Sequence, residues 1–402
     1  MKKEHINYII LTVVFIILVA WGFKCAKGND FESYYDVAMQ FKALSPNIYM
    51  PGAISGMINH YPPFFAMIMV PFTLIPPLAA GYVFYVIKMA LFLYMLVLIP
   101  GLFKDLKISK AAIALGFVTA LRFIADDFKL GQVNVPVMAL IVLAIYYKEK
   151  DNLVLSAVLL ALSSTIKLYP ALFIVYFLMK RDYKYVLYCA AAVLVLNLLP
   201  GIFYLEKYPA LINYFLRESV FNASTDPNSY TANQSVYAML MRFLGANPTH
   251  AQQLPFVNFI NLSFEKIKII YYAAALFSLA FMAYMARKKD KNLHEINVIF
   301  VLSLLLPMVA RKANFVMIFL PALVLFHEML DKKTMGTLMK VLLWTAFALL
   351  VLTSDGIIGR NLSNSAEALS LIAFGAIILM KINAWMAVSG KKRRIPAAGD
   401  AG

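Results

Sequence analysis

The chain has 402 residues, of which 62% are hydrophobic and only 14% are charged. Average soluble domains are about 45–50% apolar and about 25% charged, so this composition excludes an ordinary soluble protein. It predicts an all-α, polytopic integral membrane protein. The net charge of +16 is better explained by the basic loops of a membrane protein than by affinity for nucleic acid, and no nucleic-acid partner is expected.

The first apolar run covers residues 6–23 and follows a short basic N-terminus. It resembles a signal peptide, but no small-residue cleavage site follows it, so we expect a retained first helix. With the runs that follow, the chain is predicted to cross the membrane about twelve times. The further runs lie at residues 79–101, 111–125, 133–147, 153–165, 169–179, 185–203, 267–286, 296–310, 314–327, 341–353 and 366–386.

The connecting charges predict the orientation of the chain. If the N-terminus is placed inside, most of the 37 Lys and Arg residues fall on the inner face, as the positive-inside rule requires. This assignment needs the segment from Pro62 to Pro76 to enter the outer face without crossing. We therefore expect a multi-pass protein of the bacterial inner membrane with both termini in the cytoplasm. Residues 1–390 form a single membrane domain in this reading, and residues 391–402 form a basic, disordered cytoplasmic tail.

Two segments on the outer face are much longer than the other connections, at residues 24–78 and 204–266. Both mix aromatic, proline and polar residues, which is not the composition of a solvating linker. Loops of this length in a compact protein are usually functional. We therefore expect the chemistry of the protein to take place at the outer surface of the membrane.

Asp30 opens the first of these segments, close to the end of the first apolar run. A carboxylate set among aromatic residues at a membrane helix end is suited to act as a general base. The structural alternative is that Asp30 caps a helix carrying Tyr34, Val37 and Phe41 at helical spacing. Asp36, a turn and a half later, is expected to lie on a solvated face.

A second polar cluster joins two apolar runs around residues 122–134. Gln132 and Asn134 begin a helix whose free N–H groups and dipole favour anions, and Arg122 and Lys129 add positive charge. The alternative is an ordinary polar loop in which Asn134 faces a neighbouring helix. The pattern alone leaves both readings open.

Three further cations stand at or near the predicted outer face, and a fourth lies inside a predicted span. Lys167 lies between apolar segments, where a lysine either snorkels to the interface or meets a lipid phosphate. Arg311 and Lys312 lie between two predicted spans and break the positive-inside rule, which favours anion binding. Lys88 lies near the middle of its span, where a charge usually faces the protein interior and pairs with a carbonyl or carboxylate, or serves transport.

Several absences narrow the chemistry. The five histidines are scattered, and no paired metal-ligand motif is present. No Gly-x-x-x-x-Gly-Lys-Ser/Thr loop occurs for ATP binding, and no Gly-x-Ser-x-Gly elbow occurs for acyl transfer. We therefore expect no metal and no cofactor.

Taken in order, the outer-face motifs resemble the GT-C class of membrane glycosyltransferases. The resemblance is specifically to glycosyltransferase family 87, the polyprenol-phosphate-mannose-dependent α-mannosyltransferases. It rests on Asp30-Phe31-x-x-Tyr34, Tyr61-Pro62-Pro63-Phe64, Gly131-Gln132-Val133-Asn134, Ile166-Lys167-x-Tyr169-Pro170, and Asn233-Gln234-Ser235 followed by Arg242. One departure is that Pro307 is followed by Met308, Val309 and Ala310 where family members often carry an aromatic–His pair.

The resemblance implies an enzyme in which Asp30 deprotonates an acceptor hydroxyl for inverting attack on the donor sugar. The donor would be a polyprenyl-phosphate-linked hexose, with mannose as the family's sugar, and the acceptor a lipid-linked or glycan molecule on the outer face. For the donor phosphate we nominate Lys167, Arg311 and Lys312, with Arg122 and Lys129 behind them. For sugar or acceptor hydroxyls we nominate Tyr61, Gln132, Asn134, Asn233 and Gln234. Apart from these partners, only membrane lipids are expected.

The strongest alternative from another class is a flippase or transporter for a lipid-linked sugar. It predicts functional charges along the bundle interior, such as Lys88, and symmetry between two halves of the chain. The sequence shows no internal repeat. The long outer segments with their acidic opening favour an enzyme.

Overall fold

The structure is a computed structural model that describes residues 20–102, 108–217, 230–245, 257–287 and 293–389. Most of the described chain is helical, and within these ranges two isolated bridges are present and no strand. The all-α prediction is therefore confirmed. Most of the first predicted helix and the whole of the predicted tail at 391–402 lie outside the described residues.

The helices follow the apolar runs predicted from the sequence, because a chain in lipid must satisfy its backbone groups internally. The elements are α2 (Asn29–Lys42), α3 (Pro63–Met69), η1 (Val70–Leu74), α4 (Pro77–Leu98), η2 (Ile99–Leu102), α5 (Lys110–Leu130), α6 (Asn134–Glu149), α7 (Leu153–Ile166), α8 (Ala171–Met179), α9 (Tyr183–Leu198), α10 (Gly201–Tyr204), η3 (Leu205–Lys207), α11 (Tyr208–Phe215), α12 (Val236–Leu244), α13 (Phe264–Ala286), α14 (Leu293–Leu305), η6 (Lys312–Ile318), α15 (Phe319–Leu330), α16 (Thr337–Val351), α17 (Asp355–Ala368) and α18 (Leu371–Ser389).

Fewer helices are long and apolar enough to cross a membrane than the sequence predicted. Among the described residues, five helical segments are long and apolar enough to span a membrane, and a sixth arises if α16 and α17, bent by 88°, form one span. Several of the other predicted runs form helices too short to pass the same test, such as α7 and α14. The chain is therefore a multi-pass membrane protein, and the prediction of about twelve crossings is not confirmed.

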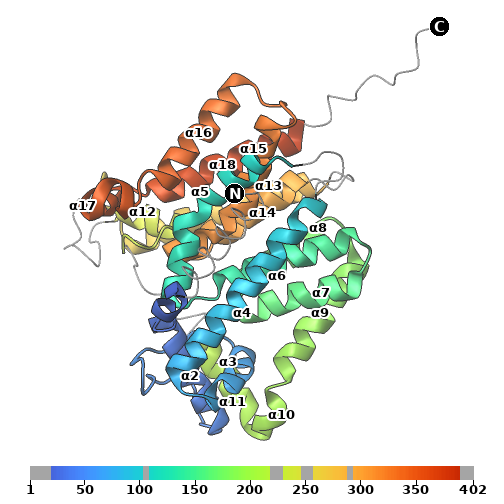
Figure 1. Ribbon diagram of the computed structural model, residues 1–402, viewed down its shortest axis with the longest axis vertical. Helices are drawn as coiled ribbons and strands as arrows, with labels where there is room; N and C mark the ends of the chain where they lie inside the picture. The colour runs from blue at the N-terminus through green and yellow to red at the C-terminus, as the bar shows by residue number, and fades with distance from the viewer. Residues whose placement is uncertain (1–19, 103–107, 218–229, 246–256, 288–292, 390–402) are drawn as a thin grey trace, which may run out of the picture.

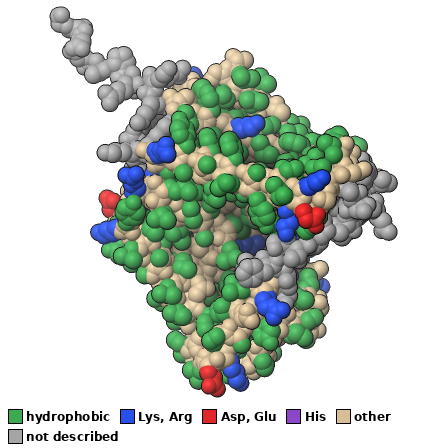
Figure 2. Space-filling model, turned by 180° about the vertical axis from the view of Figure 1, so that it is seen from behind, with side chains coloured by type: hydrophobic (Ala, Val, Ile, Leu, Met, Phe, Trp, Pro, Cys, Tyr) green, Lys and Arg blue, Asp and Glu red, His purple; other side chains and the backbone are tan. Residues whose placement is uncertain are grey.

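The helices form two groups (Figure 1), which meet where α6 contacts η6 and where α8 contacts α13 and α14. In one group α4, α6, α7, α8 and α9 lie together, with α2, α3 and α11 at their end; in the other, α5 packs on α15, and α18 packs on α14 and α16. Hydrophobic side chains cover much of the outer face in Figure 2. An apolar exterior is what lipid contact requires, so the surface agrees with the membrane assignment.

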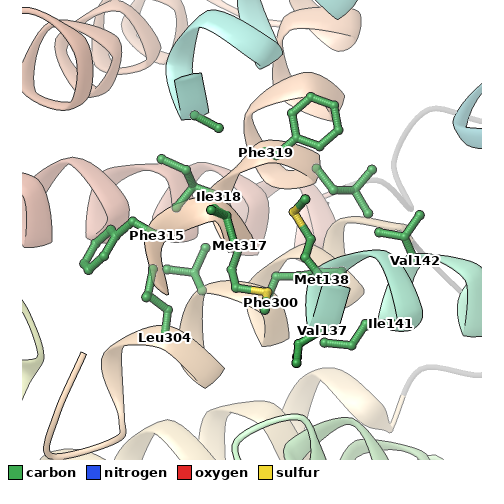
Figure 3. Packing of buried hydrophobic residues seen from close by; sticks show 14 of the residues in the cluster. Val137, Met138, Ile141, Val142, Phe300, Leu304, Phe315, Met317, Ile318 and Phe319 are labelled. Carbon is green, nitrogen blue, oxygen red and sulfur yellow. The ribbon is translucent and has the colours of Figure 1, made fainter. Parts of the chain in front are cut away.

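The centre of the fold lies where the two groups join. In Figure 3, Val137 and Met138 of α6 face Phe300 of α14 and Met317 of η6, and all four side chains are buried. Helices α14 and α15 are apolar and buried on almost every side, as expected for helices surrounded by others. This core fixes the ends of α5, α6 and η6 relative to one another.

The two long segments predicted on the outer face pack against each other. Ile48 and Tyr49 of the first form one hydrophobic cluster with Tyr204, Leu211 and Phe215 of the second. Both segments contain helices, which include α2 and α3 in the first and α11 and α12 in the second. The part of the second segment around α11 thus lies beside α2 and α3, whereas α12 lies in the other group of helices and packs on α13.

Asp36 corrects one expectation for the first segment. Its side chain is 5% exposed and accepts hydrogen bonds from the backbone N–H of Ile54 at 3.0 Å and of Ser55 at 2.7 Å. The predicted solvated position is wrong, because the loop after α2 folds back over this carboxylate. Asp36 thereby holds the loop against the helix.

Candidate active site

The start of α2 packs directly on the junction between α5 and α6. Gly131 ends α5 in the left-handed conformation, with a φ of 71°, and a Cβ there would lie 2.8 Å from Cβ of Phe31. A Cβ on Gly28 would lie 2.5 Å from the carbonyl carbon of Leu130. Only glycine allows this approach, and it brings Asp30, in the first turn of α2, to the junction.

Asp30 does not cap its helix by its side chain. Gly28 occupies the N-cap position of α2, and no side-chain capping bond is formed there. The helix itself is confirmed, with Tyr34, Val37 and Phe41 buried along one side. The capping alternative for Asp30 is therefore wrong, and its partly exposed carboxylate is available for other contacts.

Asp127, which we did not nominate from the sequence, organises the junction. Its Oδ2 accepts hydrogen bonds from the backbone N–H of Asn134 at 2.8 Å and of Val135 at 3.3 Å. Its Oδ1 lies 2.7 Å from Nζ of Lys88, and both side chains are almost completely buried. The two α6 N–H groups are thus occupied by this carboxylate, and Lys88 has the carboxylate partner that its position in a span predicted.

The side chain of Asn134 connects three of the nominated residues. Its Oδ1 accepts a hydrogen bond from Nζ of Lys167 at 2.6 Å, and the Tyr169 hydroxyl lies 3.4 Å from the same oxygen. Its Nδ2 donates to Oε1 of Gln132 at 3.3 Å. Gln132, Asn134 and Lys167 therefore form one group, and the alternative in which Asn134 faces a neighbouring element is also correct.

Aromatic side chains line this group. Nζ of Lys167 lies 5.5 Å from the ring centre of Tyr61, and the hydroxyls of Tyr61 and Tyr34 are 2.8 Å apart. Tyr34 and Tyr169 were not nominated, although each belongs to a motif that we singled out. Such rings present flat apolar faces with a polar edge, which suits them to contact a sugar.

Four charged residues affect the pKa of Lys167, two of them at the start of α2 and just before η6. Burial lowers the pKa of Lys167 to about 8; the carboxylates of Asp127 and Asp30 oppose this shift, and Arg311 and Lys88 add to it. Burial raises the pKa of the Tyr61 phenol; Asp30 raises this pKa further, and Arg311 lowers it. Asp30 and Arg311 therefore lie close enough to Lys167 and Tyr61 to affect their pKa values.

Asn233 and Gln234 hold the segment that carries Arg311. Asn233 pairs with Arg311 in an isolated antiparallel bridge, its Nδ2 donates to the carbonyl of Met308 at 2.9 Å, and its Oδ1 accepts from the N–H of Ala310 at 2.9 Å. The backbone N–H of Gln234 donates to the Ala310 carbonyl at 2.8 Å. These contacts are internal, so both residues position the segment after α14.

The remaining nominated cations form a second group beside the first. Lys312 pairs with Glu367 at 2.8 Å, and Nη1 of Arg122 donates to the Thr353 hydroxyl at 3.1 Å. Burial raises the pKa of Asp126, and three nearby cations oppose this rise. They are Lys312, Arg122 and, at the exposed end of α5, Lys129. The two groups are adjacent, because Asp126 precedes Asp127 and Lys312 follows Arg311 in the chain.

The surface is hollowed near the middle of the face in Figure 2, and a Lys or Arg side chain lies deep in the hollow. The polar residues described above come from the ends of α5, α7 and α14 and the starts of α2, α6 and η6. Helix ends that meet in this way give a polar site at the boundary of an apolar bundle. The fold and site together define a multi-pass membrane protein with a polar, charged site where these helix ends meet.

The comparisons with known proteins give the family. The sequence profile of glycosyltransferase family 87 matches residues 59–310, which is more than half of the chain. The chain therefore belongs to glycosyltransferase family 87 and is a membrane glycosyltransferase, with a sugar donor, an acceptor and lipids as its partners. No match was found among curated proteins or among solved structures.

The matched region covers only part of the site. Tyr61, Gln132, Asn134, Lys167 and Asn233 lie within it, whereas Asp30 and Arg311 lie outside. Family membership therefore shows the class of reaction. The role of each residue rests on the geometry.

Proposed function

We propose that this protein transfers a hexose from a polyprenyl-phosphate donor to a hydroxyl of a lipid-linked or glycan acceptor on the outer face of the membrane. Mannose is the sugar that the family resemblance implies. The observation that carries the proposal is that Lys167 lies against Tyr61, whose hydroxyl is 2.8 Å from that of Tyr34 on the helix that carries Asp30. Asp30 and Arg311 also lie close enough to affect the pKa of Lys167. A base, two cations and an aromatic wall are the parts that such a transfer needs.

In the proposed reaction Asp30 accepts the proton of the acceptor hydroxyl. The acceptor oxygen then forms a bond to the anomeric carbon, and the bond from that carbon to the phosphate oxygen breaks, so that the electron pair leaves with the polyprenyl phosphate. A double displacement would need a second free carboxylate as nucleophile. Asp127 does not serve as one, because it is buried against Lys88 and the start of α6, and we therefore propose inversion.

We propose that Lys167 and Arg311 hold the donor phosphate, since charge builds up on its oxygens as the bond breaks. Fixed donors and charges of this kind are usually a large part of catalysis, at about 3 kcal/mol for one donor. Lys312, Arg122 and Lys129 supply further positive charge beside this pair. Gln132, Asn134 and Tyr61 contact the sugar, and Asn233 and Gln234 act by holding Arg311 in place.

The test is transfer of a labelled hexose from a polyprenyl phosphate by the purified protein in lipid vesicles. Asp30→Asn should lower kcat by about 10²-fold or more, the lower end of the range for loss of a general base. Glu32→Gln is the matched control, because Glu32 lies in the same first turn of α2, and it should keep near-normal transfer. Undiminished transfer by Asp30→Asn would refute the assignment of the base.

The flippase alternative depended on an interior charge. Lys88 is the residue concerned, and it forms a buried pair with Asp127 that ties α4 to α5. This pairing gives Lys88 a local role, so no observation favours transport over transfer.

A further inference from the structure

We infer that Asp127, supported by Lys88, is a positioning residue that aims Asn134 and Lys167 at the donor phosphate. The inference rests on the proposed function, in which Lys167 holds that phosphate. Asp127 itself is completely buried and does not touch the substrate in this scheme. It acts through the start of α6.

A continuous chain of contacts joins Lys88 to Lys167 through Asp127 and Asn134. One carboxylate oxygen of Asp127 is held by Lys88, which also donates to the Asp127 backbone carbonyl at 3.0 Å. The other oxygen holds the backbone N–H of Asn134, and the side chain of Asn134 accepts the short bond from Lys167. Each member of this chain fixes the next, so the position of the Lys167 ammonium depends on the Asp127 carboxylate.

Three members of this chain of contacts are buried. Lys88, Asp127 and Asn134 are 1%, 0% and 0% exposed, so water cannot replace a lost partner in this chain. A buried polar group left without its partner costs about 1–3 kcal/mol, and more if it is charged. The arrangement of Asn134 is therefore set by Asp127 and not by solvent.

Lys88 and Asp127 form a buried pair of opposite charges. A buried ion pair gives little net stability, and apolar residues of similar volume often serve as well. Charged residues at such positions in membrane helices usually mark function. Here the carboxylate has a specific effect on its neighbour, because it opposes the loss of the proton from Lys167 that burial favours.

The effect of the Asp127 charge on Lys167 can be separated from the role of Asp127 as the cap of α6. Asp127 and Asp30 raise the pKa of Lys167, whereas Arg311 and Lys88 lower it, and burial brings it to about 8. The rings of Tyr61 and Tyr169 lie beside the ammonium. Removing the charge of Asp127 should therefore lower the pKa of Lys167 even where the helix cap is preserved.

Asp127→Asn is the informative variant, because asparagine keeps the shape and an oxygen that can accept the α6 N–H groups. We expect the KM for the donor to rise about fivefold at pH 8, because a fall of about one unit in the pKa of Lys167 lowers its protonated fraction from about one half to about one eleventh. The alkaline limit of donor kcat/KM should move to lower pH, and the KM for the acceptor should stay unchanged. Asp151→Asn is the matched control, because Asp151 is an exposed carboxylate just after the opposite end of α6, and it should leave the donor KM and the alkaline limit unchanged.

A second measurement does not depend on sugar transfer. The rate at which acetic anhydride acetylates Lys167, followed by mass spectrometry as the pH is varied, reports the pKa of that lysine. Asp127→Asn should shift this titration to lower pH. Should this variant fold poorly, the pair Lys88→Met with Asp127→Asn removes the unpaired lysine. It should show a smaller shift in the same direction, because Lys88 itself lowers the pKa of Lys167 less than Asp127 raises it.

Two results would overturn the inference. One is an unshifted titration of Lys167 in Asp127→Asn. The other is an equal rise in the KM for donor and acceptor with an unshifted alkaline limit of donor kcat/KM, which indicates a purely structural role. A protein that transfers no hexose from polyprenyl phosphate, but shows the Lys167 shift, would overturn the proposed function and leave the positioning of Lys167 intact.

Discussion

At the scale of single residues, Lys167 links the two halves of the site. It bonds to Asn134 on one side and lies against Tyr61 on the other, while Asp30 and Arg311 act on its charge. Sequence alone left a snorkelling lysine and a phosphate ligand equally open. The structure turns its ammonium inward, because Asn134 offers a buried oxygen within 2.6 Å.

Donor use should depend on pH through this lysine. The pKa of Lys167 is lowered to about 8, so the ammonium is present below that pH and is lost as the pH rises through it. We expect donor kcat/KM to fall above pH 8 in the unmodified protein. Lys167→Met should lower donor kcat/KM at pH 7 and remove this alkaline limit, and a retained limit would assign it to another group.

Asn233 tests the role of the segment before Arg311. Asn233→Ala removes bonds to Met308 and Ala310 and should lower the free energy of unfolding by about 1–3 kcal/mol. The KM for the donor should rise because Arg311 loses its support, which a thermal melt and donor kinetics would measure. Asn361→Ala, at an exposed position of α17, is the control, and an effect of Asn233→Ala on acceptor KM alone would contradict the assignment.

At the scale of elements, the contact between α2 and the end of α5 positions Asp30, the proposed base. Gly131→Ala should strain the left-handed turn, where φ is 71°, and push against Phe31. A loss of about 1 kcal/mol or more in stability is expected, with a larger fall in kcat because Asp30 moves. Unfolding and single-turnover transfer would measure the two effects.

Gly356→Ala provides the control for this prediction. A Cβ at Gly356 meets no atom within 4 Å, so stability and transfer should stay close to those of the unmodified protein. If Gly131→Ala behaved in the same way, α2 would not depend on the α5 turn for its position.

Whole helices were more predictable than their contacts. Each apolar run predicted after residue 78 coincides with helical structure, because lipid leaves a backbone no other way to satisfy its groups. The short helices α3 and α12 were not predicted as such, because aromatic, proline and polar residues there give no long apolar run. Their positions come from packing between segments distant in the chain.

At the scale of the whole molecule, the two ends of the bundle differ. The long segments meet at one end, where Tyr49 packs with Phe215, and Lys184 lies at the start of α9, whose other end approaches those segments. Both described cysteines, Cys25 and Cys189, are buried. Labelling of introduced cysteines can therefore report the orientation.

A membrane-impermeant maleimide should label Ala53→Cys and Lys184→Cys from opposite sides of sealed inside-out and right-side-out vesicles. Both positions are exposed. With the proposed orientation, Ala53→Cys reacts from the outer side and Lys184→Cys from the cytoplasmic side. Reaction of both from the same side would contradict the predicted topology, and the unmodified protein should not be labelled.

By itself the sequence determined that this is an α-helical membrane protein with polar motifs at helix ends, since hydropathy decides which segments enter lipid. It also pointed to the residues of the site, including Asp30, Lys167 and Arg311. It did not show that Asp127 binds Lys88, 39 positions earlier, or that Asn233 holds the backbone 75 positions later. Those pairings depend on which helix faces meet, and apolar helices with little difference between their faces leave that choice to tertiary packing.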